Sequence, residues 1–219
     1  MKDDSNKVSE FIFVCCDLVL LNILWLVFCF PVVTIGASTA ALHNVIKKIT
    51  FKENYSVWSD FWKSFKENAR QSSIVFFFLA MAAAICVSDL YIGMNSEDEF
   101  GAVSTVIGFI GLYLAFSTWI IACTLMVRYE VNSAKLIRNA LLIGLMNPHI
   151  PIAGVTAAAL FPALSLINIS FGVVSIPLWI AGGGALPAFI VQTLMRKVYK
   201  RIETENDNRK ESQHVDSQA

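Results

Sequence analysis

The residues of this sequence that could carry chemistry are polar side chains inside long apolar segments. Asp17 lies about seven residues into the first apolar segment, and Asn22 follows five positions later. A carboxylate inside a bilayer is costly unless it has a partner, so Asp17 is a candidate functional residue. The alternative is a carboxylate near the outer headgroups that is hydrogen-bonded to a neighbour or snorkels to the interface. Five positions correspond to about 140° around a helix, so Asn22 does not share its face and is expected to hydrogen-bond between helices.

Other polar residues offer weaker signals. Asp89 lies near the end of the second apolar segment, beside an acidic loop, where interfacial solvation explains it without a function. His149 follows Pro148 and is interpreted as an interfacial histidine at a helix end; the alternative is a proton-linked switch. The three histidines and five cysteines form no motif with metal-ligand spacing. Without a metal motif, nucleophile elbow or phosphate loop, we predict no cofactor and no enzymatic activity.

Glycine and proline interrupt two of the apolar segments. Pro31 ends or kinks the first, and Gly36 begins a run of small residues that permits close helix packing. The last segment is interrupted by a set of helix-breaking or small residues: Pro177, Gly182, Gly183, Gly184 and Pro187. Discontinuous helices of this kind build binding sites in transporters. The alternative is close packing, for which Gly and Pro are common in membrane helices.

Composition predicts an integral membrane protein. The chain has 219 residues, of which 56% are hydrophobic and 16% are charged, whereas soluble domains are nearer a quarter charged. A net charge of zero gives no long-range attraction to nucleic acid. The apolar runs approach the roughly 20 residues that a bilayer requires, and the first reads as an uncleaved span because its flank is not positive. The expected spans are residues 11–30, 74–94, 103–127, 150–169 and 171–194.

These patterns predict an all-α, polytopic transmembrane helical bundle of about five spans. Residues 1–203 are expected to form one membrane-embedded domain, and residues 204–219 a disordered cytoplasmic tail. Amphipathic helices are expected at about 37–50, 56–70 and 133–146, the last two at the cytoplasmic interface. In residues 56–70 one face carries the aromatic side chains Trp58, Phe61, Trp62 and Phe65. The alternative for that helix is packing beneath the bundle.

The distribution of basic residues predicts the orientation. Lys and Arg concentrate in residues 31–71, in residues 128–147 and in the tail after residue 195, whereas the 95–102 loop has none. Because Lys and Arg mark cytoplasmic loops, the C-terminus is expected inside and the 95–102 loop outside. Five spans then place the N-terminus outside. In the alternative, residues 32–46 are a return leg and the N-terminus is inside.

Three stretches carry a family resemblance: Asn22 to Trp25, Pro31 to Gly36, and Ser38 to Leu42. Together with the aromatic-basic segment 61–72, they resemble the signature of YesL-like bacterial membrane proteins, a domain of unknown function. Ala37 departs from the proline that often follows the glycine in that family. The resemblance implies the plasma membrane and a carbohydrate-uptake context in Gram-positive bacteria. It implies no catalytic residue.

Two functions follow as expectations. The first is an accessory or regulatory role in carbohydrate uptake, with the lipid bilayer and a carbohydrate transporter or another membrane protein as partners. The alternative is a small secondary transporter with a broken fifth helix, which two helical units of similar plan, residues 56–127 and 133–194, would suit. Neither function involves nucleic acid.

Overall fold

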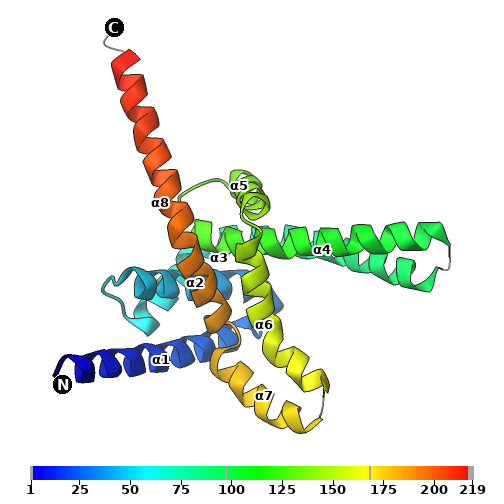
Figure 1. Cartoon of the computed structure of the whole chain (residues 1–219), viewed down its shortest axis with the longest axis horizontal. Coiled ribbons are helices and arrows are strands. Elements are labelled where there is room, and N and C mark those ends of the chain that lie inside the picture. Colours follow the sequence, from blue (N-terminus) through cyan, green and yellow to red (C-terminus); the bar gives the residue numbers. More distant parts are fainter. Residues whose placement is uncertain (1, 97, 168, 217–219) are drawn as a thin grey trace.

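The computed structural model is helical throughout the residues that it describes, which are 2–96, 98–167 and 169–216 (Figure 1). Side chains are described for residues 8–96, 98–160, 162–163 and 175–204. The elements in chain order are α1 (Lys2–Cys29), the 3-10 turn η1 (Val32–Thr34), α2 (Ile35–Phe51), α3 (Val57–Asn95), α4 (Glu99–Met126), α5 (Ser133–Met146), α6 (His149–Ile167), α7 (Ile169–Gly182) and α8 (Ala185–Asp216).

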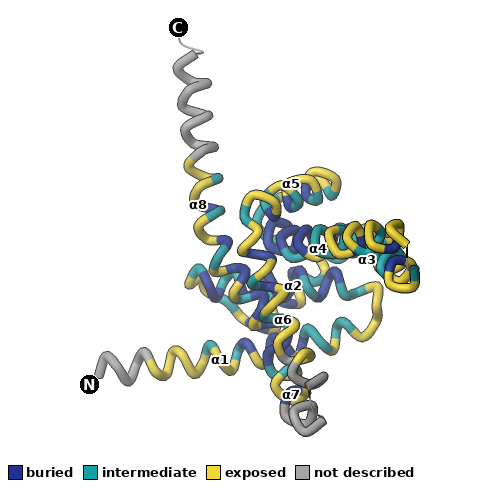
Figure 2. The backbone as a smooth tube through the Cα atoms, turned by 45° about the vertical axis from the view of Figure 1, so that its right-hand side comes forward, coloured by how far each residue is buried: buried dark blue, intermediate teal, exposed yellow. Residues whose placement is uncertain are grey.

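Three of these helices are long and apolar enough to cross a membrane. They are Val8–Cys29 of α1, all of α3 and all of α4. Two further spans are counted if each bent pair of helices is one span: α5 with α6, bent by 93°, and α7 with α8, bent by 48°. Many large apolar side chains of α1, α3 and α4 are exposed, as lipid contact requires (Figure 2). The helical class and the membrane character predicted from composition are therefore supported, with three to five spans.

The most enclosed element is the short helix α2. Eleven of its residues are buried, and it packs against α1, α3, α4 and α8 (Figure 2). Its small residues allow this, because a Cβ atom added at Gly36 would lie 2.6 Å from the backbone oxygen of Ser72 in α3. The amphipathic helix expected at 37–50 is thus a central packing element, and the small-residue run has the packing role expected of it.

Helices α1 and α2 form an antiparallel pair around the turn at Pro31. Beyond that turn, the Ser38 hydroxyl donates to the backbone carbonyl of Trp25 at 2.9 Å. At the other end of the pair, the Tyr55 hydroxyl donates to Asp17 at 2.6 Å, and Lys52 lies 4.0 Å from Glu10. The first half of α1 therefore lies beside the α2–α3 loop. We expected the N-terminus and the basic 47–70 segment on opposite sides of the membrane, but they lie at the same end of the molecule.

Residues 56–70 do not form a separate helix, because α3 runs unbroken from Val57 to Asn95. Phe28 of α1 contacts the rings of Phe61, Trp62 and Phe65 at centroid distances of 5.3–5.7 Å. Phe61 is buried and Phe65 half-buried, whereas Trp58 is 60% exposed. The aromatic face is thus partly inside the bundle, which matches the packing alternative better than a helix lying flat on a bilayer.

Helices α5 and α8 differ in how closely their bounds follow the sequence prediction. Helix α5 has the expected bounds, packs against α4 through Leu136, Ala140 and Gly144, and ends at Asn147. Helix α8 instead continues to Asp216, where we expected disorder from residue 204. Five of the 13 residues from 204 to 216 are Glu, Arg, Lys or Gln, which have high helix propensity, so a polar sequence there is compatible with a helix. Residues 217–219 lie outside the described part of the chain.

Candidate functional site

The break between α7 and α8 is held by one side chain from α1. The Asn22 amide nitrogen donates to the backbone carbonyls of Ile180 (2.6 Å) and Trp179 (3.2 Å). Its oxygen accepts from the backbone N–H groups of Gly184 (2.8 Å) and Ala185 (2.9 Å). Helix ends leave such carbonyls and N–H groups unpaired, so the fully buried Asn22 caps the end of α7 and the start of α8 together. This is the interhelical hydrogen bonding expected of Asn22.

The expected fifth span, residues 171–194, is divided at Gly183 and Gly184, which lie between the two helices. A Cβ atom at Gly184 would lie 2.7 Å from the Trp25 ring, so glycine allows α1 to approach the break closely. Pro187 lies in the first turn of α8, where its missing N–H removes no helix hydrogen bond. Pro177 lies inside α7. The glycine run, rather than either proline, is where the chain bends.

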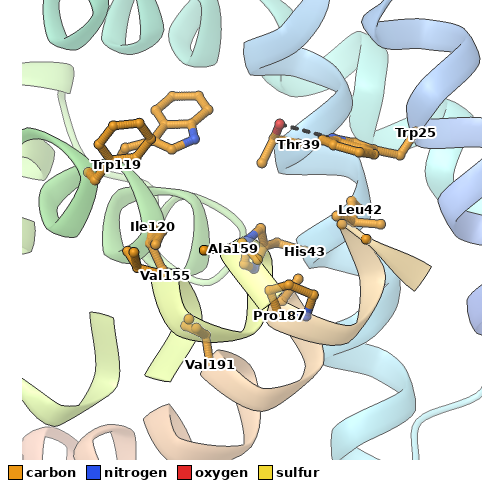
Figure 3. Close-up of a pocket in the computed structure, with 16 residues that line it drawn as sticks. Trp25, Thr39, Leu42, His43, Trp119, Ile120, Val155, Ala159, Pro187 and Val191 are labelled. Carbon is orange, nitrogen blue, oxygen red and sulfur yellow. Dashed lines mark hydrogen bonds between the residues drawn. The ribbon is translucent and has the colours of Figure 1, made fainter. Parts of the chain in front are cut away.

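An apolar cavity of about 450 Å³ lies beside this break (Figure 3). Five helices enclose it, and the residues that line it are Trp25, Thr39, Leu42, His43, Phe116, Trp119, Ile120, Gly154, Val155, Ala158, Ala159, Gly183, Gly184, Pro187, Ala188 and Val191. Volumes of roughly 300–1,000 Å³ with mostly apolar walls are typical of small-molecule sites. The cavity at the break is therefore the candidate functional site.

His43 is the exceptional polar residue of this cavity. It is 4% exposed, and its Nδ1 atom has no hydrogen-bond partner among the described residues. Figure 3 shows its ring at the centre of the cavity lining, between Ala159 and Pro187. The hydroxyl of Thr39, in contrast, is fully engaged: it accepts from the Trp25 indole at 3.2 Å and donates to the Ile35 carbonyl at 2.7 Å. The otherwise apolar cavity lining thus includes one side chain with an unpaired buried nitrogen.

The two aspartates predicted as intramembrane candidates lie elsewhere. Asp17 accepts the hydrogen bond from Tyr55, and partial burial together with this bond raises the pKa of Tyr55 to about 12. This partnered carboxylate matches the structural alternative for Asp17. Asp89 is half-buried near the α3–α4 turn, where its backbone carbonyl accepts from the Ser104 hydroxyl at 2.9 Å. Neither aspartate lines the cavity.

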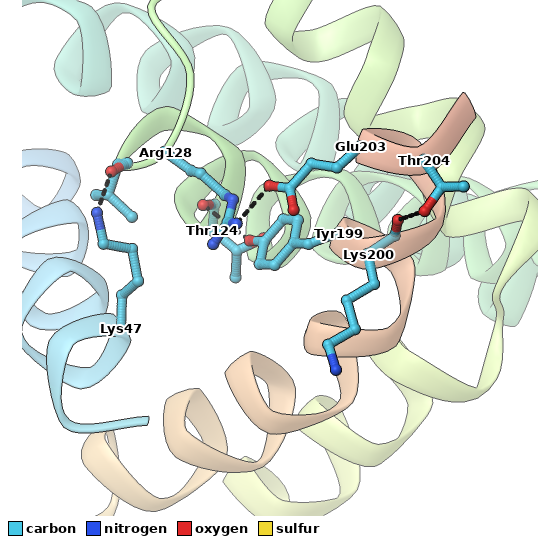
Figure 4. A network of polar contacts seen from close by, with 8 residues as sticks. Lys47, Thr124, Arg128, Tyr199, Lys200, Glu203 and Thr204 are labelled. Atoms are coloured by element: carbon cyan, nitrogen blue, oxygen red, sulfur yellow. Dashed lines mark hydrogen bonds and ion pairs between the residues drawn. The ribbon is translucent and has the colours of Figure 1, made fainter. Parts of the chain in front are cut away.

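A polar network joins α2, α4 and α8 at their basic ends (Figure 4). Lys47 donates to the backbone carbonyl of Val127 at 2.9 Å, and Arg128 forms an ion pair with Glu203 at 2.5 Å. The Arg128 guanidinium also lies over the Tyr199 ring, 4.4 Å from its centroid, and the Tyr199 hydroxyl donates to the Thr124 carbonyl at 3.1 Å. These contacts fix the end of α4 against α8.

The tertiary structure thus combines only some of the residues that sequence singled out. Asn22 and Gly182–Gly184 meet at the break, and Pro187 lines the cavity, whereas Pro31 and Gly36 belong to the α1–α2 turn and the α2–α3 contact. His43 was considered only as part of a metal motif and set aside, and Thr39 and Trp119 carried no signal. In the part of the chain that the structure describes, no group of three His, Cys, Asp or Glu residues could hold a metal ion.

These features define a class: a helical protein whose helices are long and apolar enough to span a membrane, with a helix break that Asn22 caps beside an apolar cavity. Residues 18–90 match the model of a family described as "Protein of unknown function, DUF624". That match covers the last 12 residues of α1, all of α2 and most of α3, and so includes Asn22 and His43 but not α8. No curated protein and no solved structure matches the chain.

Proposed function

We propose that this protein is an accessory or regulatory membrane protein of carbohydrate uptake in the bacterial plasma membrane, and not itself the sugar carrier. The observation that carries the proposal is the chemistry of the cavity. A sugar has many hydroxyl groups, and each needs a hydrogen-bond partner when it leaves water. The lining of the cavity is mostly apolar, and its one side chain with an unpaired buried polar atom is that of His43. The carbohydrate context itself rests on the resemblance to YesL-like proteins.

The polar surface suited to a partner lies at the basic end of the molecule. A polar depression of about 570 Å³ is present there, lined by residues of α2, α3 and the α4–α5 connection that include Asn44, Glu67, Gln71 and Arg128. By the distribution of Lys and Arg we infer that this end is cytoplasmic. The contacts of Glu10 and Asp17 with the α2–α3 loop support an N-terminus on that same side, with α2 as the return leg.

The test is reconstitution together with deletion. The purified protein in liposomes is expected to give no saturable flux of labelled mono- or oligosaccharides. Deletion of its gene is expected to lower uptake, or induction of uptake, through a separate transporter. Saturable flux by the protein alone, lost on Asn22→Leu but kept in Asn95→Leu, would reject the accessory role.

Saturable flux by the protein alone would instead support the second candidate function, that of a small secondary transporter. The observation that favours it is the broken helix itself, because discontinuous helices expose backbone groups at transporter sites. Here, however, Asn22 already pairs two carbonyls and two N–H groups at the break. Few backbone groups are left for a substrate, so the accessory role is the better supported of the two.

A further inference from the structure

We propose that the cavity beside the α7–α8 break binds an uncharged lipid alcohol, a hydrocarbon chain with one hydroxyl that hydrogen-bonds to His43. This goes beyond the proposed function and does not depend on it. The argument starts from the walls, where aliphatic and aromatic side chains such as Leu42, Trp119, Ile120 and Val191 predominate. A hydrocarbon chain gains by contact with such a surface, and a strongly hydrated molecule does not.

The second step is the single polar contact. A buried polar atom without a hydrogen-bond partner is unfavourable, so His43 favours an occupant that hydrogen-bonds to it. A neutral imidazole has one nitrogen that donates and one that accepts. A hydroxyl both donates and accepts, so it pairs with His43 in either tautomer. A plain alkane leaves the atom unpaired, and a carbonyl serves only one tautomer.

The third step is charge. Apart from His43, no residue that lines the cavity has an ionisable acid or base in its side chain. The nearest amide of the break, that of Asn22, already makes four hydrogen bonds. A carboxylate or phosphate headgroup buried here would lack a cationic partner, which is strongly unfavourable in an apolar site. The headgroup is therefore neutral.

The route of entry is consistent with a lipid. Phe116 of α4 and Val155 and Ala159 of α6 line the cavity and have exposed side chains. Both helices belong to segments apolar enough to lie in a membrane. An amphiphile dissolved in the bilayer can thus reach the cavity sideways, between α4 and α6, without crossing water.

The experiment uses the full chain in lipid nanodiscs and a dodecanol analogue that carries a photoreactive diazirine. Labelling is expected on peptides of α2, α4, α6 or α8 that line the cavity, and unlabelled dodecanol is expected to compete. Dodecane and dodecanoate are expected to compete at least tenfold more weakly. Equal competition by dodecane, or stronger competition by dodecanoate, would overturn the proposal.

Two variants and a matched control locate the site. His43→Phe is expected to reduce competable labelling at least tenfold, whereas the same change at His149, an exposed residue outside the cavity, is expected to leave it unchanged. Ala158→Phe fills the cavity from α6 and is expected to abolish labelling while keeping His43. If His43→Phe does not fold, the Ala158→Phe variant tests the proposed site. Undiminished labelling in folded Ala158→Phe protein would refute the proposed site.

Discussion

At the residue scale, the Asn22 amide hydrogen-bonds to backbone groups that the break between α7 and α8 would otherwise leave unpaired. The four backbone groups that it pairs come from both sides of the α7–α8 break, and the Asn22 side chain itself is fully buried. No water is present in a bilayer core to satisfy such groups, so a break there needs a partner from the protein. Asn22, a polar residue in the apolar helix α1, thus has a structural role at the distant break between α7 and α8.

We expect Asn22→Leu to lower the free energy of unfolding by about 1–3 kcal/mol, because it leaves buried carbonyl and N–H groups unpaired. Reversible unfolding in mixed micelles measures the change. The matched control is Asn95→Leu, since Asn95 is exposed and its side chain donates to the Tyr91 carbonyl within its own helix. Equal stability of the Asn22 and Asn95 variants would contradict the clamp.

Tyr55 and Asp17 illustrate a second residue-scale lesson. A carboxylate inside an apolar run suggested function, but its partner is a tyrosine from the loop after α2. The pairing is a long-range contact that links α1 to the α2–α3 loop. It also carries topological information, because it places the first half of α1 beside a basic loop.

At the element scale, α3 shows that an amphipathic segment need not be a separate helix. Residues 57–70 are continuous with the apolar segment, and their aromatic face divides between the bundle and its surface. Phe28 supplies the packing partner that the periodicity of residues 56–70 could not identify. The same pattern of residues thus suits an interfacial helix and a packed one.

Alanine replacements of Phe61 and Trp58 test which aromatic side chains pack inside the bundle and which lie on its surface. Phe61→Ala is expected to lower the free energy of unfolding by about 3 kcal/mol, because Phe61 is 1% exposed and its loss leaves a cavity against Phe28. Trp58→Ala, at an exposed position of the same helix, is expected to change it by about 0.5 kcal/mol or less. The measurement is again unfolding in mixed micelles. A larger effect at Trp58 than at Phe61 would favour the interfacial arrangement.

At the scale of the whole molecule, the contacts between α1 and the α2–α3 loop bring these two parts of the chain to the same end of the molecule. We expect the N-terminus, the α2–α3 loop and the C-terminal segment to be cytoplasmic, and the α3–α4 turn to be outside. Single cysteines at Ser5, Asn54, Ser96 and Ser212, in a variant without the five native cysteines, test this with an impermeant thiol reagent.

In intact cells only the Ser96 site is expected to react, and the other three only after permeabilisation. Reaction at Ser5 together with Ser96 would restore the five-span arrangement with an outside N-terminus. Reaction at Ser212 but not at Ser96 would invert the orientation altogether.

Sequence by itself determined the helical class, the apolar segments and the bounds of α5, because these depend on local hydrophobicity and helix-breaking residues. The glycine run likewise marked the break in the last apolar segment. Only the tertiary structure decided that α2 is enclosed, that Asn22 reaches that break 157–163 residues away, and that His43 faces a cavity. Each of these depends on contacts between helices distant in the chain, and local periodicity carries no record of which helix covers which face.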